Sequence, residues 1–320
     1  MFNNHKSYNR MYREGELTLG LHIPLENFKM RTPTLERQVE LAQKADDYGF
    51  TALWLRDVLL KDPNFLDPAV GQIYDMLIYG THLLGQTKNI ALGTSALGTS
   101  ALVLPLRHPL RSAKEVATIE ALFPERLILG ISSGDRRADF KGLGVDHSTR
   151  GDQFKESLRV MEQALYNNYP TIDSPYGEVE QATLVPRPKK RIPTMITGFA
   201  QQDMDWLGAN GDGWMYYPQA PFAQQQVLDA WRASGEAHGR AFRPFSMPIH
   251  LDLTHDPDEP PTPIRLGFRI GRNHLIKLLE SYRAIGVNHL FFALFDGERP
   301  AEEVIDELGE YVLPHFPPLD

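Results

Sequence analysis

Strand-like and helix-like segments alternate along the chain from Leu17 onward, and this alternation constrains the fold more than any other feature. Each short β-rich run is followed by an amphipathic stretch of helical length, which is the pattern of βα units and a parallel sheet. We expect strands at residues 17–23, 51–55, 90 onward, 126–131, 193–197, 213–217, 245–253 and 289–294. We expect helices at residues 34–49, 68–85, 109–123, 154–167, 201–211, 222–239, 271–286 and 301–312.

Eight strands and eight helices in alternation predict an α/β fold of the (β/α)₈ (TIM) barrel type rather than an open doubly wound sheet. The length of 320 residues suits this fold, because such barrels have about 250 residues and tolerate insertions. We expect one domain over residues 1–320, with residues 1–16 as an N-terminal extension and extended loops after strands four and seven.

Three long irregular segments interrupt the alternation, at residues 134–151, 171–191 and 254–271. Loops that follow barrel strands lie on the catalytic face, and long loops are often functional lids. Residues 134–151 and 254–271 are therefore lid candidates. Residues 171–191 precede a strand, and we expect them at the floor of the barrel.

Composition excludes several classes of protein. The chain has no cysteine, which rules out disulfides, thiolate nucleophiles and thiolate metal sites. Its 11 histidines are scattered singly, so we expect no metal, and no phosphate-binding loop with a Gly-Lys-Ser/Thr ending is present. The net charge of −8, without a basic stripe, argues against nucleic acid as a partner.

The hydropathy pattern argues against a membrane protein. No run approaches the ~20 consecutive apolar residues of a membrane span. The first residues, MFNNHKSYNRMYREGE, are polar and differ from a signal peptide. We expect a soluble, unprocessed, cytoplasmic protein that does not contact membranes.

Small residues gather at the expected strand ends. The unit LGTSA occurs twice in succession, at residues 92–96 and 97–101, and strand five ends in Thr197, Gly198, Phe199 and Ala200. Strand five runs into the helix at 201–211, whose free N–H groups and dipole would form an anion site. An ordinary turn that uses glycine for close packing is an equal alternative. Trp214 and Tyr216 offer aromatic surface nearby, or simply belong to the core.

One catalytic motif matches the sequence. Residues 130–134, Gly-Ile-Ser-Ser-Gly, fit the Gly-x-Ser-x-Gly pattern of a hydrolase nucleophile. That motif requires a helix directly behind the serine, whereas here the glycine-containing stretch DRRADFKGLGVDHS follows. A strand end of small residues that admits a flat ligand is the other interpretation.

The stretch Leu97 to Asp146, LGTSALVLPLRHPLRSAKEVATIEALFPERLILGISSGDRRADFKGLGVD, resembles the bacterial luciferase-like family of flavin-dependent monooxygenases, which are (β/α)₈ barrels. Weaker similarity in LGLHIPLE, ALWLRD, PTMITGFA and GDGWMYYP extends the resemblance over most of the chain. The sequence is most similar to a subgroup of uncharacterised luciferase-type oxidoreductases, which says little about the substrate.

The resemblance implies a monooxygenase that uses reduced FMN and O₂ on a small organic substrate. It also implies a separate flavin reductase as partner and a homodimer. Three alternatives stay open: a deazaflavin-dependent hydride-transfer oxidoreductase on the same fold, a serine hydrolase at Ser132, and a non-catalytic flavin-binding protein.

The resemblance also implies cofactor-binding residues. Counted back from VLPLRHP, the second repeat copy (Thr99, Ser100, Ala101) supports the flavin ring; if that copy lies in an enlarged loop, Thr94 and Ser95 of the first copy take its place. A five-residue insertion changes strand parity, so we expect a bulge between Thr94 and Ser100. The other implied positions are Ser132 and Ser133 near the flavin, Gly198, Phe199, Ala200, Gln201 and Gln202 on the phosphate turn, and Trp214.

The expected catalytic groups follow strands two and three. Several family members have a histidine after strand two, where this chain has Val58. Asp57 could orient Arg56, which would then steady an anionic flavin oxygen, or the two could form a structural ion pair. His108 is a further catalytic candidate. Arg107 and Arg150 are additional polar candidates, and Arg126 is expected to anchor strand four.

Overall fold

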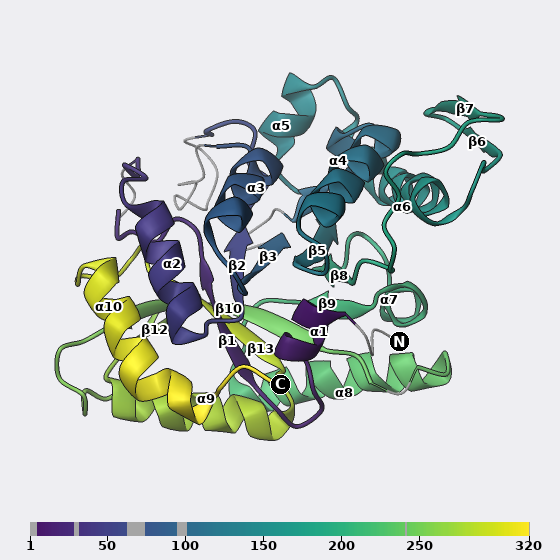
Figure 1. Ribbon diagram of the computed structural model, residues 1–320. Coiled ribbons are helices and arrows are strands. Elements are labelled where there is room, and N and C mark those ends of the chain that lie inside the picture. Colours follow the sequence, from purple (N-terminus) through teal and green to yellow (C-terminus); the bar gives the residue numbers. More distant parts are fainter. Residues whose placement is uncertain (1–4, 29–31, 63–73, 95–100, 241, 320) are drawn as a thin grey trace.

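A computed structural model describes residues 5–28, 32–62, 74–94, 101–240 and 242–319 (Figure 1). Eight parallel strands form a closed barrel, as the alternation predicted, because β13 pairs with both β1 and β10. In barrel order the strands are β1 (Thr18–His22), β2 (Ala52–Leu55), β3 (Ala91–Thr94), β5 (Leu127–Ser132), β8 (Thr194–Thr197), β9 (Gly213–Met215), β10 (Phe245–Leu253) and β13 (His289–Ala293).

Helices surround the barrel and connect its strands. They are α2 (Gln38–Tyr48), α3 (Met76–Gln86), α4 (Pro109–Leu122), α6 (Arg150–Tyr166), α7 (Met204–Asn210), α8 (Pro221–Ala237), α9 (Arg272–Ile285) and α10 (Ala301–Glu307). A π-helical turn (Leu308–Val312) and a 3₁₀ turn (Leu313–His315) continue α10.

The third helix begins later than expected. Its predicted start at Pro68 is wrong, because Tyr74 and Asp75 are not helical and α3 begins at Met76. The Asp75 carboxylate accepts hydrogen bonds from the backbone N–H groups of Leu77 and Ile78 at 2.9 and 3.0 Å. An aspartate cap of this kind satisfies N–H groups that the first helical turn leaves without partners, and so fixes where the helix starts.

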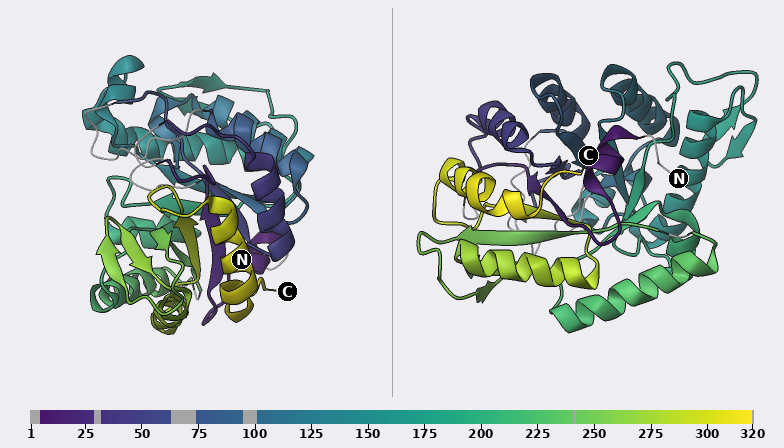
Figure 2. Two further views of the ribbon diagram at one scale, coloured as in Figure 1. Left: turned by 90° about the vertical axis from the view of Figure 1, so that its left-hand side faces the viewer. Right: turned by 60° about the horizontal axis from the view of Figure 1, so that its bottom comes forward.

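The N-terminal segment closes the floor of the barrel. Helix α1 (Lys6–Met11) lies across the amino-terminal end of the strands, where the C-terminal segment also arrives (Figure 2, right). Tyr8, Met11 and Tyr12 join the side chains that fill the barrel interior, and the Tyr12 hydroxyl is 3.1 Å from the Ser246 hydroxyl on β10.

A satisfied polar chain crosses the lower interior. The Trp54 indole N–H donates to Nε2 of His289 at 2.8 Å, so Nδ1 of His289 carries the proton and faces the Thr18 hydroxyl at 2.9 Å. Thr18 in turn donates to the Met11 carbonyl. His289 is therefore a structural histidine with both ring nitrogens hydrogen-bonded.

The two loops that were expected as lids contain secondary structure. After β5, residues 134–149 include α5 (Arg137–Gly142) and a 3₁₀ turn (His147–Thr149). After β10, the antiparallel hairpin β11 (Thr262–Ile264) and β12 (Gly267–Ile270) adds to the sheet, with β12 parallel to residues 250–253 of β10. Gly267 is required there, because a Cβ atom at this position would lie 1.9 Å from the His250 carbonyl oxygen.

The segment 171–191 does not lie only at the floor, and that expectation is wrong. It contains the hairpin β6 (Ile172–Ser174) and β7 (Gly177–Val179). This hairpin packs along α6, beside the start of α4 (Figure 1). The Tyr176 carbonyl accepts from His108, the cap of α4, at 3.0 Å. Because α4 starts at the mouth of the barrel, the hairpin reaches the mouth before the chain returns to the floor.

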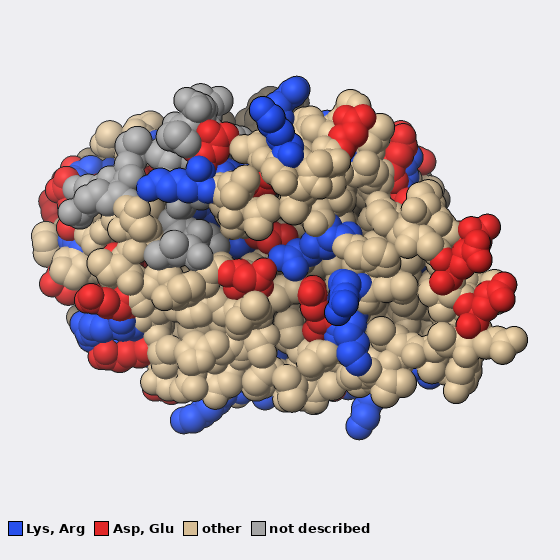
Figure 3. All heavy atoms as spheres, turned by 90° about the horizontal axis from the view of Figure 1, so that it is seen from above, with Lys and Arg blue, Asp and Glu red and all other residues tan. Residues whose placement is uncertain are grey.

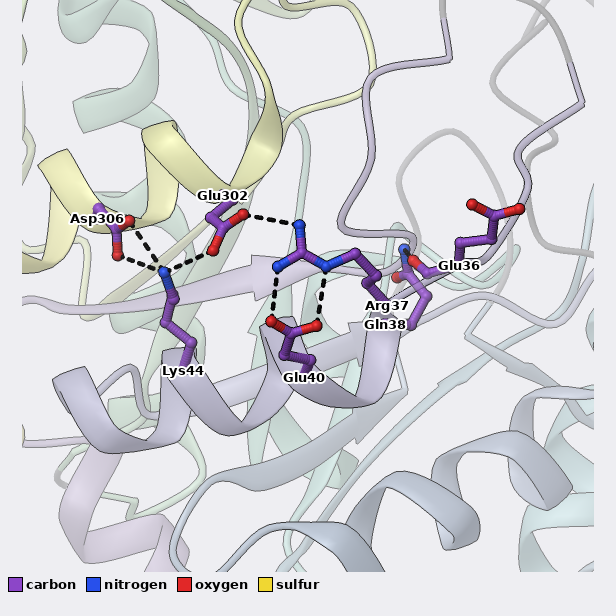
Figure 4. Close-up of polar contacts among 7 residues, drawn as sticks. All are labelled: Glu36, Arg37, Gln38, Glu40, Lys44, Glu302 and Asp306. Atoms are coloured by element: carbon purple, nitrogen blue, oxygen red, sulfur yellow. Dashed lines mark hydrogen bonds and ion pairs between the residues drawn. The ribbon is translucent and has the colours of Figure 1, made fainter.

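Ion pairs link α2 with α10 where the ring of helices closes (Figure 4). Arg37 bridges Glu40 and Glu302, and Lys44 bridges Glu302 and Asp306, all at 2.6–3.0 Å. These side chains are partly or largely exposed, and each such pair contributes about 0–1 kcal/mol. The parallel pairing of β1 with β13 therefore closes the barrel, and the ion pairs add little.

Surface charge on the face seen from above is mixed. Lys and Arg side chains are interspersed with Asp and Glu over the part of this face that is not grey (Figure 3). Within the described ranges, no helix combines the length and apolar character that a membrane crossing requires.

Candidate functional site at the mouth of the barrel

A cavity of about 280 Å³ opens at the carboxyl ends of β5, β8 and β9. Ligand sites of (β/α)₈ barrels lie at this end, and the volume is near the lower end of the range for small-molecule pockets. The lining residues are Ser132, Ser133, Gly134, Asp135, Thr197, Gly198, Phe199, Ala200, Gln201, Met215, Tyr216 and Tyr217.

The turn after β8 forms one wall of the cavity. Gly198, Ala200 and Gln201 have φ angles of 61°, 48° and 62°, a left-handed conformation that non-glycine residues rarely adopt. The Trp214 indole N–H donates to the Gly198 carbonyl at 2.7 Å, and the Gln202 amide donates to the Gly151 carbonyl at 3.0 Å. Trp214 and Gln202 thus hold the turn in place without lining the cavity, whereas residues 198–201 do line it.

The expected anion site at the start of the following helix is wrong. Helix α7 has only seven residues and begins at Met204. The Asp203 carboxylate caps it by accepting from the Trp206 N–H at 2.7 Å. A negative charge of the protein itself therefore already occupies the helix N-terminus, and only the turn at residues 198–202 remains as a place for a phosphate.

Two buried hydroxyl groups in the cavity wall have no hydrogen-bond partner in the described part of the chain. They are the Ser132 Oγ at the end of β5 and the Thr197 Oγ1 at the end of β8, with residue exposures of 6% and 8%. An unsatisfied buried hydroxyl costs about 1–3 kcal/mol. Both side chains therefore suit a polar ligand in the cavity.

The serine hydrolase alternative lacks a base next to Ser132 among the described residues. Among the described residues no histidine or other base is hydrogen-bonded to Ser132, and α5 begins only at Arg137. A nucleophilic serine requires a base within hydrogen-bonding distance, positioned in turn by a third group. Ser132 is therefore better explained as a polar group of the cavity wall.

Aromatic side chains form the other wall. Tyr216 stacks on Trp214 with ring centroids 5.0 Å apart, and Phe199 meets Tyr216 edge to face at 5.4 Å. The sequence indicated Tyr216 only as aromatic surface, and Gly134, Asp135, Thr197, Met215 and Tyr217 were not expected in the site. Their common feature is a position at or just after the end of β5, β8 or β9.

The repeated segment interrupts the pairing with β5. Gly93 pairs with Ile128 in β3, and Leu102 pairs with Ile131 in β4 (Leu102–Val103). Between these two pairs the chain thus advances nine residues on one side and three on the other, a difference of six. Six is an even number, so side chains before and after the interruption keep the same facing. The expected bulge and the candidates Ser95, Thr99 and Ser100 lie outside the described residues.

Thr94 and Gly130 join the two strands at this interruption. The Gly130 N–H donates to the Thr94 hydroxyl at 2.6 Å, and that hydroxyl donates to the Gly130 carbonyl at 2.7 Å. A Cβ atom on Gly130 would lie 1.8 Å from the Thr94 carbonyl oxygen. The Thr94 hydroxyl thus belongs to the strand contact. Ala101 is fully buried beside it.

Asp57 does not orient Arg56, so that expectation is wrong. Instead the Asp57 carboxylate accepts two hydrogen bonds from the Arg107 guanidinium, at 3.0 and 3.1 Å. Arg107 also pairs with Asp75 at the start of α3. The 3₁₀ turn at Leu104–Leu106 brings Arg107 to this position, and the two-pronged contact fastens the loop after β2.

Three other polar candidates take structural positions. His108 caps α4, accepting from the Leu110 N–H at Nδ1, with Nε2 against the Tyr176 carbonyl; it is not among the cavity residues. Arg150 donates to the Gly134 carbonyl at 3.0 Å and supports the loop after β5. Arg126 anchors its strand as expected, donating to the carbonyls of Leu84, Thr87 and Ile90.

Arg56 lies near a second set of polar side chains in the mouth, His22, His250 and Asp296, which the sequence did not indicate. Its guanidinium carbon lies 5.9 Å from the centre of the Phe295 ring, which also contacts His22 and His250. His250 is hydrogen-bonded to Asp296 at 2.5 Å. These residues carry no recognisable spacing, because they come from four different strands.

The structure is a (β/α)₈ barrel with a cavity at the carboxyl end of its strands. The chain belongs to the luciferase-like monooxygenase family, whose model matches residues 17–259. This confirms the resemblance found in the sequence.

Relatives of two kinds match the sequence. The chain is 25% identical over 225 residues to the F420-dependent glucose-6-phosphate dehydrogenase of Kineococcus radiotolerans, a match that covers 68% of this chain and 64% of that enzyme. It is 22% identical over 179 residues to the alkanal monooxygenase alpha chain of the Kryptophanaron alfredi symbiont, with 55% and 47% covered. The chain thus spans less than two thirds of either relative.

Solved structures of both kinds share the fold. An F420-dependent secondary alcohol dehydrogenase in complex with an F420-acetone adduct superposes with a TM-score of 0.75 at 18% identity, covering 94% of this chain and 99% of that one. The monooxygenase RslO1 from Streptomyces bottropensis gives 0.77 at 16% identity, with 93% and 99% covered.

Proposed function

We propose that this oxidoreductase binds a deazaflavin coenzyme of the F420 type in the mouth cavity and transfers hydride between it and a small hydroxyl or carbonyl compound. The observation that carries the proposal is the pair of buried hydroxyls without a partner among the described residues, Ser132 Oγ and Thr197 Oγ1, on two residues that line the cavity beside a turn with left-handed backbone. The F420-dependent enzymes among the relatives and among the similar structures support the choice of coenzyme.

The residues present fit such a coenzyme. The turn at residues 198–201 would take its phosphate, the Ser132 and Thr197 hydroxyls would bind polar atoms of its side chain or ring, and Tyr216 would pack against it. The bound coenzyme supplies two-electron hydride transfer. The protein itself contributes orientation, exclusion of water and proton handling.

A monooxygenase that uses reduced FMN and O₂ is the second candidate. Val58, in place of the histidine that the family resemblance leads one to expect after strand two, favours it, because oxygen activation by the cofactor depends less on a protein base. The alkanal monooxygenase relative supports it as well. A separate flavin reductase would belong to this candidate, and a homodimer to either one.

Binding of three coenzymes separates the candidates. Oxidised F420, oxidised FMN and anaerobically reduced FMN are titrated into the protein and followed by tryptophan fluorescence, to which Trp214 beside the turn contributes. We expect F420 to bind at least about ten-fold more tightly than either form of FMN. Selective binding of reduced FMN would replace the proposal by the second candidate, and binding of none of the three would contradict both.

A further inference from the structure

Two buried histidines face the barrel interior on the side of the mouth opposite β5 and β8. His250 pairs with Ala293, and His22 follows Leu21, which pairs with Phe292, so His22 is level with Ala293. Residues that are level on neighbouring strands point to the same face, and Ala293 belongs to the interior cluster. Both imidazoles therefore flank one small side chain at the same height.

The Phe295 ring lies between these groups. Its centroid is 5.7 Å from that of His22 and 5.0 Å from that of His250, and the Arg56 guanidinium carbon is 5.9 Å away. Phe28 approaches the same ring at 5.3 Å. The two imidazoles, Arg56 and Asp296 thus lie around an aromatic pair, Phe28 and Phe295.

Asp296 fixes the state of His250. Nδ1 of His250 lies 2.5 Å from Oδ2 of Asp296. The hydrogen bond from His250 holds the pKa of the Asp296 carboxyl below its usual range, so the carboxylate is ionised and can only accept. The Nδ1 atom therefore carries a proton, and Nε2 is the ring nitrogen left to exchange a proton with a ligand.

Nε2 of His250 is buried and has no hydrogen-bond partner among the described residues. Both ring nitrogens of His22 are in the same situation. Burial, together with the nearby positive charge of Arg56, keeps the pKa of His22 well below its ordinary value. His22 is therefore neutral and has one N–H and one lone pair to offer.

His22 and His250 differ from the histidine below them in their hydrogen bonding, because three of their ring nitrogens lack a partner among the described residues. His289 is equally buried, yet both of its nitrogens are hydrogen-bonded. Unsatisfied buried polar groups cost about 1–3 kcal/mol each, and a chain keeps several together where a ligand uses them. No group of three or more His, Asp or Glu side chains in the described ranges could hold a metal ion, so the expected ligand is organic.

We propose that His250, positioned by Asp296, is the proton acceptor for the hydroxyl group of a small, uncharged alcohol, with His22 hydrogen-bonded to the same oxygen. The proposal rests on the proposed function. In the oxidation, the carbon–hydrogen bond breaks and hydrogen leaves with both electrons as hydride to the oxidised deazaflavin coenzyme. The hydroxyl proton moves to Nε2, and the electron pair of the O–H bond forms the C=O bond. Carbonyl reduction is the reverse.

The experiment uses the protein with oxidised F420 and a panel of propan-2-ol, butan-2-ol, cyclohexanol and benzyl alcohol. We expect His250→Gln to lower kcat by about 10²–10⁴-fold, the usual contribution of acid–base catalysis, and to leave the Kd of the coenzyme within about three-fold. The solvent deuterium isotope effect on kcat should change with it. His22→Gln should raise KM more than it lowers kcat.

Asp296 is a positioning residue with its own variants. Asp296→Asn should lower kcat less than His250→Gln does, and Asp296→Glu should restore part of the loss. His238→Gln is the matched control, because His238 also pairs with an aspartate, Asp205, at 3.0 Å, but just after the end of α8. It should change neither kcat nor coenzyme affinity.

A readout independent of the coenzyme uses ¹⁵N-histidine NMR with propan-2-ol as the probe. We expect the signals of His22 and His250, assigned with the two glutamine variants, to shift on addition of the alcohol. Unshifted signals would overturn the proposal. So would coenzyme binding without oxidation of any alcohol of the panel, or an unchanged kcat in His250→Gln. Failure of the coenzyme to bind, with shifted histidine signals, would overturn the proposed function instead.

Discussion

The two sides of the barrel mouth differ in chemistry. The side formed by β5, β8 and β9 offers hydroxyl groups, backbone in left-handed conformation and tyrosine rings. The side formed by β1, β2, β10 and β13 offers two histidines, an arginine and a carboxylate around Phe295. Hydroxyl groups and backbone N–H groups suit binding, whereas imidazoles suit proton transfer. On the proposed function, the first side would bind the coenzyme and the second would contact the substrate.

The largest expected effect concerns the side formed by β5, β8 and β9, called the binding side below. Gly198 has a φ of 61°, and a Cβ atom there would have no heavy atom within 4 Å. Gly198→Asp and Gly198→Asn therefore strain the backbone alike, and only the first adds a charge. A carboxylate about 4 Å from a phosphate costs about 4 kcal/mol near a protein surface. We expect the Kd of the coenzyme to rise at least about 100-fold with Asp and less than about ten-fold with Asn, measured by fluorescence titration.

Equal losses in the two Gly198 variants would show that no phosphate lies at the turn. The coenzyme would then not bind at the side formed by β5, β8 and β9 through this turn.

The next effect concerns the side formed by β1, β2, β10 and β13, where the substrate is proposed to bind. Arg56 is 2% exposed and lies against Phe295, near His22 and His250. Its charge would stabilise negative charge on the substrate oxygen in a region of low dielectric. Arg56→Met should lower kcat about ten-fold or more while the Kd of the coenzyme changes less than about three-fold, in steady-state kinetics and fluorescence titration respectively.

Arg283→Met is the control for Arg56, because the Arg283 guanidinium lies 5.3 Å from the Phe316 ring, away from the mouth. It should leave turnover unchanged. A wild-type rate in Arg56→Met would make Arg56 a structural residue.

A third effect is the pH dependence of stability caused by buried histidine. Burial lowers the pKa of His289 to about 3, so between pH 6.5 and 3 the unfolded chain takes up a proton that the folded chain does not. The stabilisation is complete above pH 6.5 and is lost as the pH falls, by about 1.4 kcal/mol per pH unit.

His289→Gln keeps an acceptor for Trp54 but removes this titration. The slope of the unfolding free energy against pH, from urea unfolding between pH 6.5 and 4.5, should therefore be smaller by that amount. Groups such as Glu120, whose pKa burial raises to about 7, titrate alike in both proteins and cancel in the difference. Equal slopes in the two proteins would contradict the lowered pKa of His289.

The smallest effect returns to the binding side. Thr197→Val keeps the shape of the side chain and removes a buried hydroxyl that has no partner among the described residues. The free energy of unfolding of the free protein should stay the same or rise by about 1 kcal/mol. The affinity for the coenzyme should fall about three- to ten-fold, which corresponds to one neutral hydrogen bond. A loss of stability without a loss of affinity would place the Thr197 hydroxyl in the fold instead.

The sequence predicted the barrel correctly because hydrophobic periodicity is a local property. It was less accurate at element boundaries, where a single side chain decides, as Asp75 does for α3 and Asp203 for α7. It identified Ser132, Ser133 and residues 198–201, which the structure brings together in the cavity wall. Small residues directly after a buried strand are visible along the chain, so this side of the mouth could be found from the sequence.

Pairing between distant residues could not be found in the same way. In the folded barrel Asp57 accepts hydrogen bonds from Arg107 and not from its sequence neighbour Arg56. It also brings His22, His250 and Asp296, from the first, seventh and eighth strands, around one ring.

The amino-acid sequence by itself therefore determined the eight βα units, the glycine-rich strand ends and the absence of cysteine chemistry. The tertiary structure alone decided which polar groups meet, which of them are satisfied and which are left for a ligand. The physical reason is that the carboxyl ends of parallel strands converge at one end of the barrel whatever their separation in sequence, while burial there determines the protonation state of each group.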